Sequence, residues 1–230
     1  MKVKQLDHIA LYMNDRDEAA TFLTTHLGFH VVDHTERYTL LGAGGRLGKL
    51  TLFDAPRGAT PPSPGEISRI TIRVADPESA ARELPPEAGA EPLDGGYAVA
   101  GPEGLPLALF PGEGDFTDYD LEGFVLISGS PEESARAFVE MGFAPTDDAT
   151  TLKAGEYLVR LTDGASNGGG MLFHIGCLVD SAEDHRREAE ERGLEVTDFV
   201  EGPNTLAAFV RGPEGVSVEY VEHKPTFSLT

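Results

Sequence analysis

The sequence contains almost no cysteine and no long apolar run. Its 230 residues include 1 cysteine, which excludes an intramolecular disulfide and a cysteine-rich zinc site. No apolar stretch approaches the roughly 20 residues that a membrane-spanning helix needs, so we expect no membrane segment. Residues 1–5 lead directly into a strand-like stretch. We therefore expect no signal peptide and a cytoplasmic location.

Lysine and arginine are scarce relative to the acidic residues. The chain has 18 Lys+Arg against 39 Asp+Glu, for a formal net charge of -21. The resulting negative field repels nucleic acid and anionic membrane, because binding to either depends on positive patches. The hydrophobic fraction is nevertheless 40 %, which is enough for an ordinary core. We expect a folded protein that binds neither nucleic acid nor membrane, and the sequence leaves its oligomeric state open.

One strand–turn–strand pattern occurs twice. Residues 99–109 and 210–220 share the order strand, Gly-Pro-Glu-Gly, strand. Glycine and proline at these positions favour a tight turn. The recurrence indicates an internally repeated unit, which has to be recognised before the fold can be assigned.

The start of the unit recurs as well. Strand-like apolar runs begin at four positions, Asp7, Arg69, Gly123 and His174. A helix start follows each run, with Asn14, Asp76, Ser130 and Ser181 as the candidate N-caps. Ser130 and Glu133 have the spacing of a capping box. We expect helices to end near Gly28, Gly142 and Gly193, where glycine accommodates a left-handed residue, and the second helix to end at Pro85.

Stretches rich in glycine, proline and serine separate the units at residues 55–64, 111–118 and 163–170. The units are therefore predicted as four βαβββ modules at residues 1–56, 65–112, 119–163 and 170–224. Each module is too small to bury its sheet alone. The expected fold is α+β, with the modules pairing into two curved mixed sheets, or cups, and the helices outside.

This module pattern resembles the vicinal-oxygen-chelate superfamily of glyoxalases, extradiol dioxygenases, fosfomycin-resistance proteins and bleomycin-binding proteins. The resemblance extends over nearly the whole chain. It implies that metal ligands come from one position on the first strand of a module and one on the last strand. The first-strand positions are His8, Arg69, Gly123 and His174, and the last-strand positions are Thr51, Ala108, Arg160 and Glu219.

Only the first and fourth modules offer ligand chemistry at these positions, through His8, His174 and Glu219. We therefore predict that module one pairs with four and module two with three. Two imidazoles and one carboxylate suit an open site for a divalent metal, with Fe(II) preferred and Mn(II) as the alternative. His30, His34 and Tyr38 are candidate secondary groups that line the same cup, and the alternative for each is an ordinary packed or exposed role.

Strand alternation places Cys177 on the face opposite His174, as a packed thiol. For His26, His185 and His223 we predict no functional role. In the second cup, Arg69 and Arg160 occupy the ligand-equivalent positions and repel a cation. We expect them to pair with internal acids; an anionic ligand is the alternative, because an arginine fork suits carboxylate or phosphate.

Three functions remain open at this point. The first is an extradiol-type dioxygenase whose small-molecule substrate is a catechol or hydroquinone. Two features of this chain count against it. Phe209 stands where the resemblance implies a tyrosine, and no histidine that could serve as the base lies between Val196 and Phe209. The second is a glyoxalase-like lyase or isomerase, which the resemblance associates with a fourth protein ligand where this chain has Thr51. The third is a binding protein without chemistry, of the bleomycin-resistance type.

Overall fold

The computed structural model describes residues 1–44, 48–56, 66–113, 118–165 and 170–227. Of the linker-like stretches expected at 55–64, 111–118 and 163–170, residues 57–64, 114–117 and 166–169 lie outside the described residues. Within the described part of the chain, no helix is long and apolar enough to cross a membrane.

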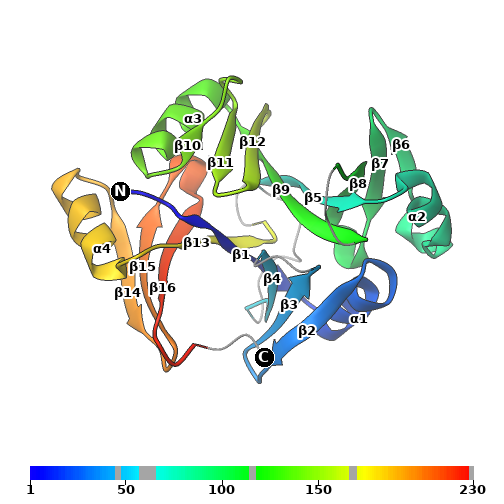
Figure 1. Cartoon of the computed structure of the whole chain (residues 1–230), viewed down its shortest axis with the longest axis horizontal. Helices are drawn as coiled ribbons and strands as arrows, with labels where there is room; N and C mark the ends of the chain where they lie inside the picture. The colour runs from blue at the N-terminus through cyan, green and yellow to red at the C-terminus, as the bar shows by residue number, and fades with distance from the viewer. Residues whose placement is uncertain (45–47, 57–65, 114–117, 166–169, 228–230) are drawn as a thin grey trace.

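Each quarter of the chain forms one strand, one helix and three further strands (Figure 1). The first contains β1 (Gln5–Met13), α1 (Arg16–His26), β2 (Phe29–His34), β3 (Tyr38–Ala43) and β4 (Lys49–Asp54). The second contains β5 (Ile67–Val74), α2 (Pro77–Glu83), η1 (Pro86–Ala88), β6 (Glu91–Leu93), β7 (Gly96–Ala100), η2 (Pro102–Gly104) and β8 (Pro106–Pro111).

The second half of the chain repeats this order. The third quarter contains β9 (Tyr119–Ser128), α3 (Pro131–Glu140), β10 (Ala144–Pro145), β11 (Thr151–Ala154) and β12 (Tyr157–Asp163). The fourth contains β13 (Leu172–Leu178), α4 (Ala182–Glu191), β14 (Val196–Glu201), β15 (Thr205–Arg211), η3 (Pro213–Gly215) and β16 (Ser217–His223).

The strands form two eight-stranded mixed sheets with matching strand orders. The first is β14-β15-β16-β13-β1-β4-β3-β2 and the second is β10-β11-β12-β9-β5-β8-β7-β6. At each centre two opening strands pair antiparallel, β1 with β13 and β5 with β9. Each opening strand has the last strand of its own quarter as a parallel neighbour. The expected α+β fold of four βαβββ modules in two curved mixed sheets is confirmed, with the helices outside (Figure 1).

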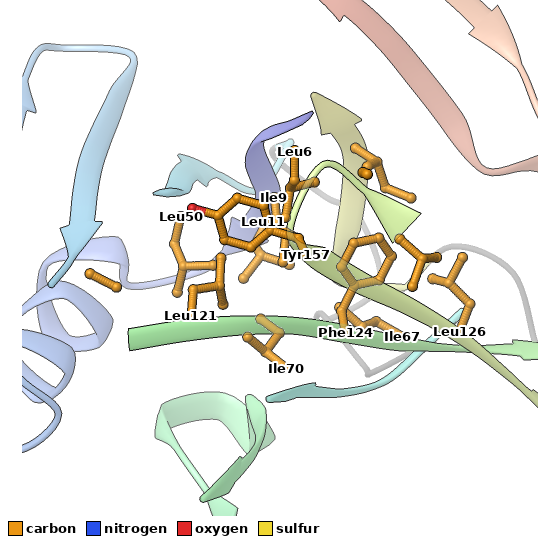
Figure 2. Packing of buried hydrophobic residues seen from close by; sticks show 14 of the residues in the cluster. Leu6, Ile9, Leu11, Leu50, Ile67, Ile70, Leu121, Phe124, Leu126 and Tyr157 are labelled. Atoms are coloured by element: carbon orange, nitrogen blue, oxygen red, sulfur yellow. The ribbon is translucent and has the colours of Figure 1, made fainter. Parts of the chain in front are cut away.

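The apolar backs of the two sheets pack against each other and form one core. Figure 2 shows side chains of the first sheet meeting those of the second: Leu6, Ile9, Leu11 and Leu50 on one side, and Ile67, Ile70, Leu121, Phe124 and Leu126 on the other. Because successive side chains on a strand point to opposite faces, His8 and Arg69 lie on the faces that turn away from this core.

One predicted N-cap, Asn14, is wrong, and one predicted capping box does not form. Helix α1 is capped by Asp15, whose carboxylate accepts from the Glu18 N–H, and not by Asn14. The Asn14 side-chain amide donates instead to Glu103, at 2.8 Å. Ser130 stands at the N-cap of α3 without a side-chain capping bond, so the predicted capping box does not form.

The other predicted helix boundaries are confirmed. Asp76 caps α2 and Ser181 caps α4, each through a side-chain oxygen that accepts a backbone N–H. The three glycines expected after helices have positive φ, namely Gly28, Gly142 and Gly193. These boundaries follow from short-range chemistry that the sequence displays directly.

The repeated Gly-Pro-Glu-Gly turn also joins the two sheets. Its glutamates, Glu103 and Glu214, both have φ of 56°. The Glu103 carboxylate accepts the backbone N–H groups of residues 14–15, at 2.9 and 2.7 Å, just before α1. Glu214 accepts from the Ser128 hydroxyl at 2.7 Å and the Gly129 N–H at 3.1 Å, just before α3. Each turn therefore ties one sheet to a helix start that belongs to the other.

Candidate metal centre

Three side chains with ligand chemistry surround Gly176 at the centre of the first sheet. Gly176 on β13 is the Cα partner of His8 on β1 and of Glu219 on β16. His174 lies two residues earlier on β13 and therefore points to the same face. A Cβ atom at position 176 would lie 2.3 Å from Cε1 of His8. The missing side chain of Gly176 gives the His8 ring the space it occupies.

The three donor atoms converge. Nε2 of His8 lies 2.9 Å from Nε2 of His174 and 3.1 Å from Oε2 of Glu219. Nε2 of His174 lies 3.2 Å from the same carboxylate oxygen. All three ligand atoms lie within 4.8 Å of one another.

This convergence leaves a buried oxygen unsatisfied. Oε2 of Glu219 has no hydrogen-bond partner within the described structure, although two imidazoles lie close to it. Buried polar atoms are nearly always hydrogen-bonded or bound to an ion. Two imidazole nitrogens and a carboxylate directed at a common point have the donor set and the unsatisfied oxygen that a divalent cation fits.

Asp7 orients His8 from behind. Oδ2 of Asp7 lies 2.9 Å from Nδ1 of His8. A carboxylate that accepts the Nδ1 proton leaves the Nε2 lone pair directed into the site, as in the carboxylate–histidine–metal arrangement. Strand alternation alone would point Asp7 away from the site, but the β1/β13 register slips between Leu6 and His8. Asp7 is the extra residue of this bulge, and a bulge redirects a side chain.

The other oxygen of Asp7 contacts two further groups. Oδ1 lies 3.0 Å from Nζ of Lys49 and 3.0 Å from Nε2 of His223. Lys49 is buried, with 3 % of its surface exposed, so the pair is an internal one. Phe227 stacks on the His223 ring at 3.6 Å. Asp7 thus connects a candidate ligand to a lysine and to a second histidine.

The protonation states follow from burial and from these neighbours. Burial opposes protonation of His8, but the carboxylates of Asp7 and Glu219 outweigh it and raise the pKa of His8 to about 9. Burial and the charge of His8 together lower the pKa of His174. Burial opposes ionisation of Glu219, yet the two imidazoles lower its pKa to about 2. The neighbouring carboxylates therefore favour a charged His8, and the two imidazoles favour an ionised Glu219.

A cavity of about 500 Å³ opens over these groups, and phenylalanine and tyrosine side chains form part of its lining. Three phenylalanine rings surround His174, with centroids at 4.5 Å for Phe173, 5.4 Å for Phe209 and 6.1 Å for Phe53. Tyr38 also lines the cavity. The polar centre therefore lies in a cavity whose apolar and aromatic lining suits an apolar group or ring.

Comparison with known families agrees with this arrangement. The family model of the Glyoxalase/Bleomycin resistance protein/Dioxygenase superfamily matches residues 5–115. This match places residues 5–115 of the chain in the superfamily.

Solved structures share the fold over nearly the whole chain. A "putative dioxygenase" from Bacillus subtilis subsp. subtilis str. 168 has a TM-score of 0.74 and 17 % identity, covering 97 % of this chain and 86 % of that one. Glyoxalase I from Zea mays has a TM-score of 0.72 and 17 % identity, covering 95 % and 92 %. The cppA protein from Streptococcus pneumoniae TIGR4 has a TM-score of 0.60 and 15 % identity, covering 96 % and 100 %. A search of curated proteins finds no match.

Of the three secondary groups predicted from the sequence, one lines the cavity. Tyr38 lines it, and the Tyr38 hydroxyl donates to Asp33 at 2.8 Å. His30 and His34 are exposed and are not among the residues that line the cavity. His34 instead shares a hydrogen bond with the Thr39 hydroxyl at 2.9 Å.

Three groups at the site received no role from the sequence. His223 lies four residues after Glu219, and Lys49 lies two before Thr51, so strand alternation places both on the cavity face. The position of His223 close to the C-terminal end of the chain obscures this signal. Asp7 carries only a weak signal, its adjacency to His8, because the bulge that turns it inward is not visible in the sequence. Cys177 is buried, as predicted.

Proposed function

We propose that this protein is a metal-dependent enzyme, an extradiol-type dioxygenase that cleaves the ring of a catechol or hydroquinone. The observation that carries the proposal is the convergence of His8, His174 and Glu219 on one point, with a buried, unsatisfied carboxylate oxygen, at the base of an aromatic cavity. His8, His174 and Glu219 would hold the metal, Fe(II) in preference to Mn(II).

Such a metal, when bound, supplies a centre that takes the oxygens of the substrate and activates dioxygen. The protein contributes position and exclusion of water. Phe53, Phe173 and Phe209 surround His174 and offer stacking and edge contacts to an aromatic ring. Asp7 fixes the His8 ring through Nδ1.

His223 is the candidate proton carrier. It lines the cavity, and its Nε2 contacts the carboxylate of Asp7 at 3.0 Å. A histidine held by a carboxylate in a substrate cavity can take a proton from a diol hydroxyl. His223 takes this role in place of His30 and His34, which lie outside the cavity.

The geometry favours the dioxygenase over a glyoxalase-like lyase or isomerase. The fourth ligand position of the first sheet carries Thr51, a buried hydroxyl that lines the cavity and lacks a carboxylate's basicity. A proton-moving carboxylate ligand in that place is what the glyoxalase-like reaction requires. The binding-protein alternative has no need for the converging donor set.

The test combines elemental analysis with oxygen consumption. The protein purified without added chelator is expected to contain about one iron per chain, and anaerobic reconstitution with Fe(II) should produce oxygen uptake with a catechol or a hydroquinone. His223→Asn should lower kcat while leaving the iron content unchanged, and His26→Asn, on helix α1, is the matched control. Nickel or zinc with lyase activity would support the glyoxalase-like function, and a protein that binds no metal would overturn the proposal.

A further inference from the structure

A second cavity, of about 690 Å³, lies on the concave face of the second sheet. Its floor corresponds strand for strand to the metal centre of the first sheet. Val125 on β9 is the Cα partner of Arg69 on β5 and of Arg160 on β12, so three neighbouring strands place these side chains next to one another on one face. Phe110 and Leu161 add apolar surface to the lining.

The arginines in this cavity differ in how they are neutralised. Arg160 donates to both carboxylate oxygens of Glu122, at 3.2 and 3.4 Å. These bonds are longer than the 2.7–2.9 Å typical of charge-assisted pairs. Arg73 forms an ion pair with Asp120. Arg69, which is half-buried, makes no hydrogen bond or ion pair within the described structure, so the expectation that it pairs with an internal acid is wrong.

A buried hydroxyl in the same lining is also unsatisfied. Thr71 lies two residues after Arg69 on β5 and has 1 % of its surface exposed. Its Oγ1 has no hydrogen-bond partner within the described residues. An unpaired guanidinium and an unpaired hydroxyl in one cavity are both donors that lack an acceptor, and leaving such groups unmatched is costly. A ligand with an anionic acceptor group would supply hydrogen-bond acceptors to both of these donors.

The surroundings restrict that acceptor to a single negative charge. Three further acids line the cavity, Asp94, Glu113 and Asp148, and all are exposed. The Asp148 carboxylate already accepts from the hydroxyls of Thr150 and Thr151. Among the described residues at the floor, Arg69 alone carries an unmatched positive charge, so a dianion such as phosphate would be repelled more than it is neutralised.

We propose that the second cavity binds a small organic monocarboxylate, with its carboxylate on Arg69 and its apolar body against Phe110, Val125 and Leu161. An arginine fork matches the two oxygens of a carboxylate, and the apolar lining suits a short aliphatic or aromatic substituent. This site is independent of the metal centre, because the two concave faces turn away from a shared core.

The experiment is isothermal titration of the full-length, metal-loaded protein with benzoate, using neutral benzamide and inorganic phosphate as comparison ligands. Benzoate is expected to bind, and to bind more tightly than either comparison ligand. Arg69→Gln should weaken benzoate binding about tenfold or more, because it removes a charge-assisted interaction. Arg69→Lys keeps the positive charge but loses the planar guanidinium, so its affinity for benzoate should lie between that of the wild type and that of Arg69→Gln.

Two control variants distinguish binding at Arg69 from binding at surface charges or in the metal cavity. Arg136→Gln, an exposed arginine on α3 whose nearest acid is Glu132 at 3.9 Å, should bind benzoate like wild type. His174→Ala should also keep the Arg69-dependent binding while it loses the metal. Benzoate binding that disappears in His174→Ala would assign the ligand to the metal cavity and overturn the proposal. Equal affinity for benzamide, tighter binding of phosphate, or undiminished binding by Arg69→Gln would do the same.

Discussion

The two sheets have the same strand order and the same irregular positions, but the faces that turn outward carry different chemistry. In the first sheet, the bulge residues are Asp7 on β1 and Phe173 on β13, where the register slips. In the second sheet, the equivalent slips make Ser68 and Glu122 the extra residues. The two sheets therefore share their strand order and the positions of their bulges, and they differ in their side chains.

The side chains around the central position show this difference most clearly. Gly176 in the first sheet corresponds to Val125 in the second, since each pairs with its neighbours in the same way. The site of His174 is taken by Gly123, where a Cβ atom would lie 1.9 Å from the carbonyl oxygen of Leu158. The second sheet thus lacks room for the histidine that completes the first site. We propose that one repeated geometry supports a cation site in one sheet and an anion site in the other.

The largest expected effect is the loss of metal from the first sheet. His174→Ala and Glu219→Gln each remove one of three ligands, so the metal content should fall from about one per chain to near zero, with turnover lost. The fold should persist, because the core lies behind the site. Elemental analysis and circular dichroism measure the two outcomes, and His30→Ala, an exposed histidine on the same sheet, is the control. Wild-type metal content in both variants would contradict the ligand assignment.

Asp7→Asn tests the residue behind His8. The amide keeps the shape but loses the charge that holds His8 and Lys49, so metal affinity should fall about 10–100-fold. Removal of one partner of a buried ion pair costs about 3–5 kcal/mol, so the melting temperature should fall as well. Chelator competition and thermal unfolding measure the two effects. Asp33→Asn, which removes an exposed carboxylate that contacts Tyr38, is the control; an equal loss of metal affinity there would show that the effect is not specific to Asp7.

Gly123→Ala tests whether the second sheet excludes a side chain at the position of His174. The added Cβ would overlap backbone atoms of Leu158, so we expect a loss of stability of about 1–3 kcal/mol. Gly129→Ala is the control, since no atom lies within 4 Å of its added Cβ. Chemical denaturation compares the two variants. Equal stability for both would show that β12 can move aside and that space does not separate the two sheets.

The smallest expected effects concern the two repeated turns. Glu103→Gln and Glu214→Gln weaken charge-assisted bonds to the helix starts of the opposite sheet, and each should cost about 1 kcal/mol. Glu103, which accepts two backbone N–H groups and the Asn14 amide, should matter more than Glu214. Thermal unfolding with the exposed Glu87→Gln as the control measures the differences. A larger effect at Glu214 would reverse this ranking of the two turns.

Much of the fold and part of the site follow from local patterns in the sequence. The repeated Gly-Pro-Glu-Gly turn and the four strand–helix starts identify the βαβββ unit, because turn and cap chemistry are decided within a few residues. The resemblance to the superfamily then assigns His8, His174 and Glu219 to ligand positions on the concave face. Strand alternation applied from Glu219 onward reaches His223, which shows that this residue could have been identified from the sequence.

The tertiary structure alone decided what depends on pairing between distant strands. The bulges that turn Asp7 and Phe173 into the cavity arise from the register of β1 against β13, and a one-residue slip reverses the face of a side chain. Asp15 rather than the predicted Asn14 caps α1, because the Asn14 side chain is bound by Glu103 from the turn of the other sheet. Arg69 has no acidic partner among the described residues, although the chain is rich in acids, because abundance in the sequence does not determine which carboxylate lies within reach. Local chemistry therefore determined the modules, and the family resemblance carried by those modules indicated the ligand positions. The supporting contacts and the character of the second cavity depend on interactions between residues far apart in the chain.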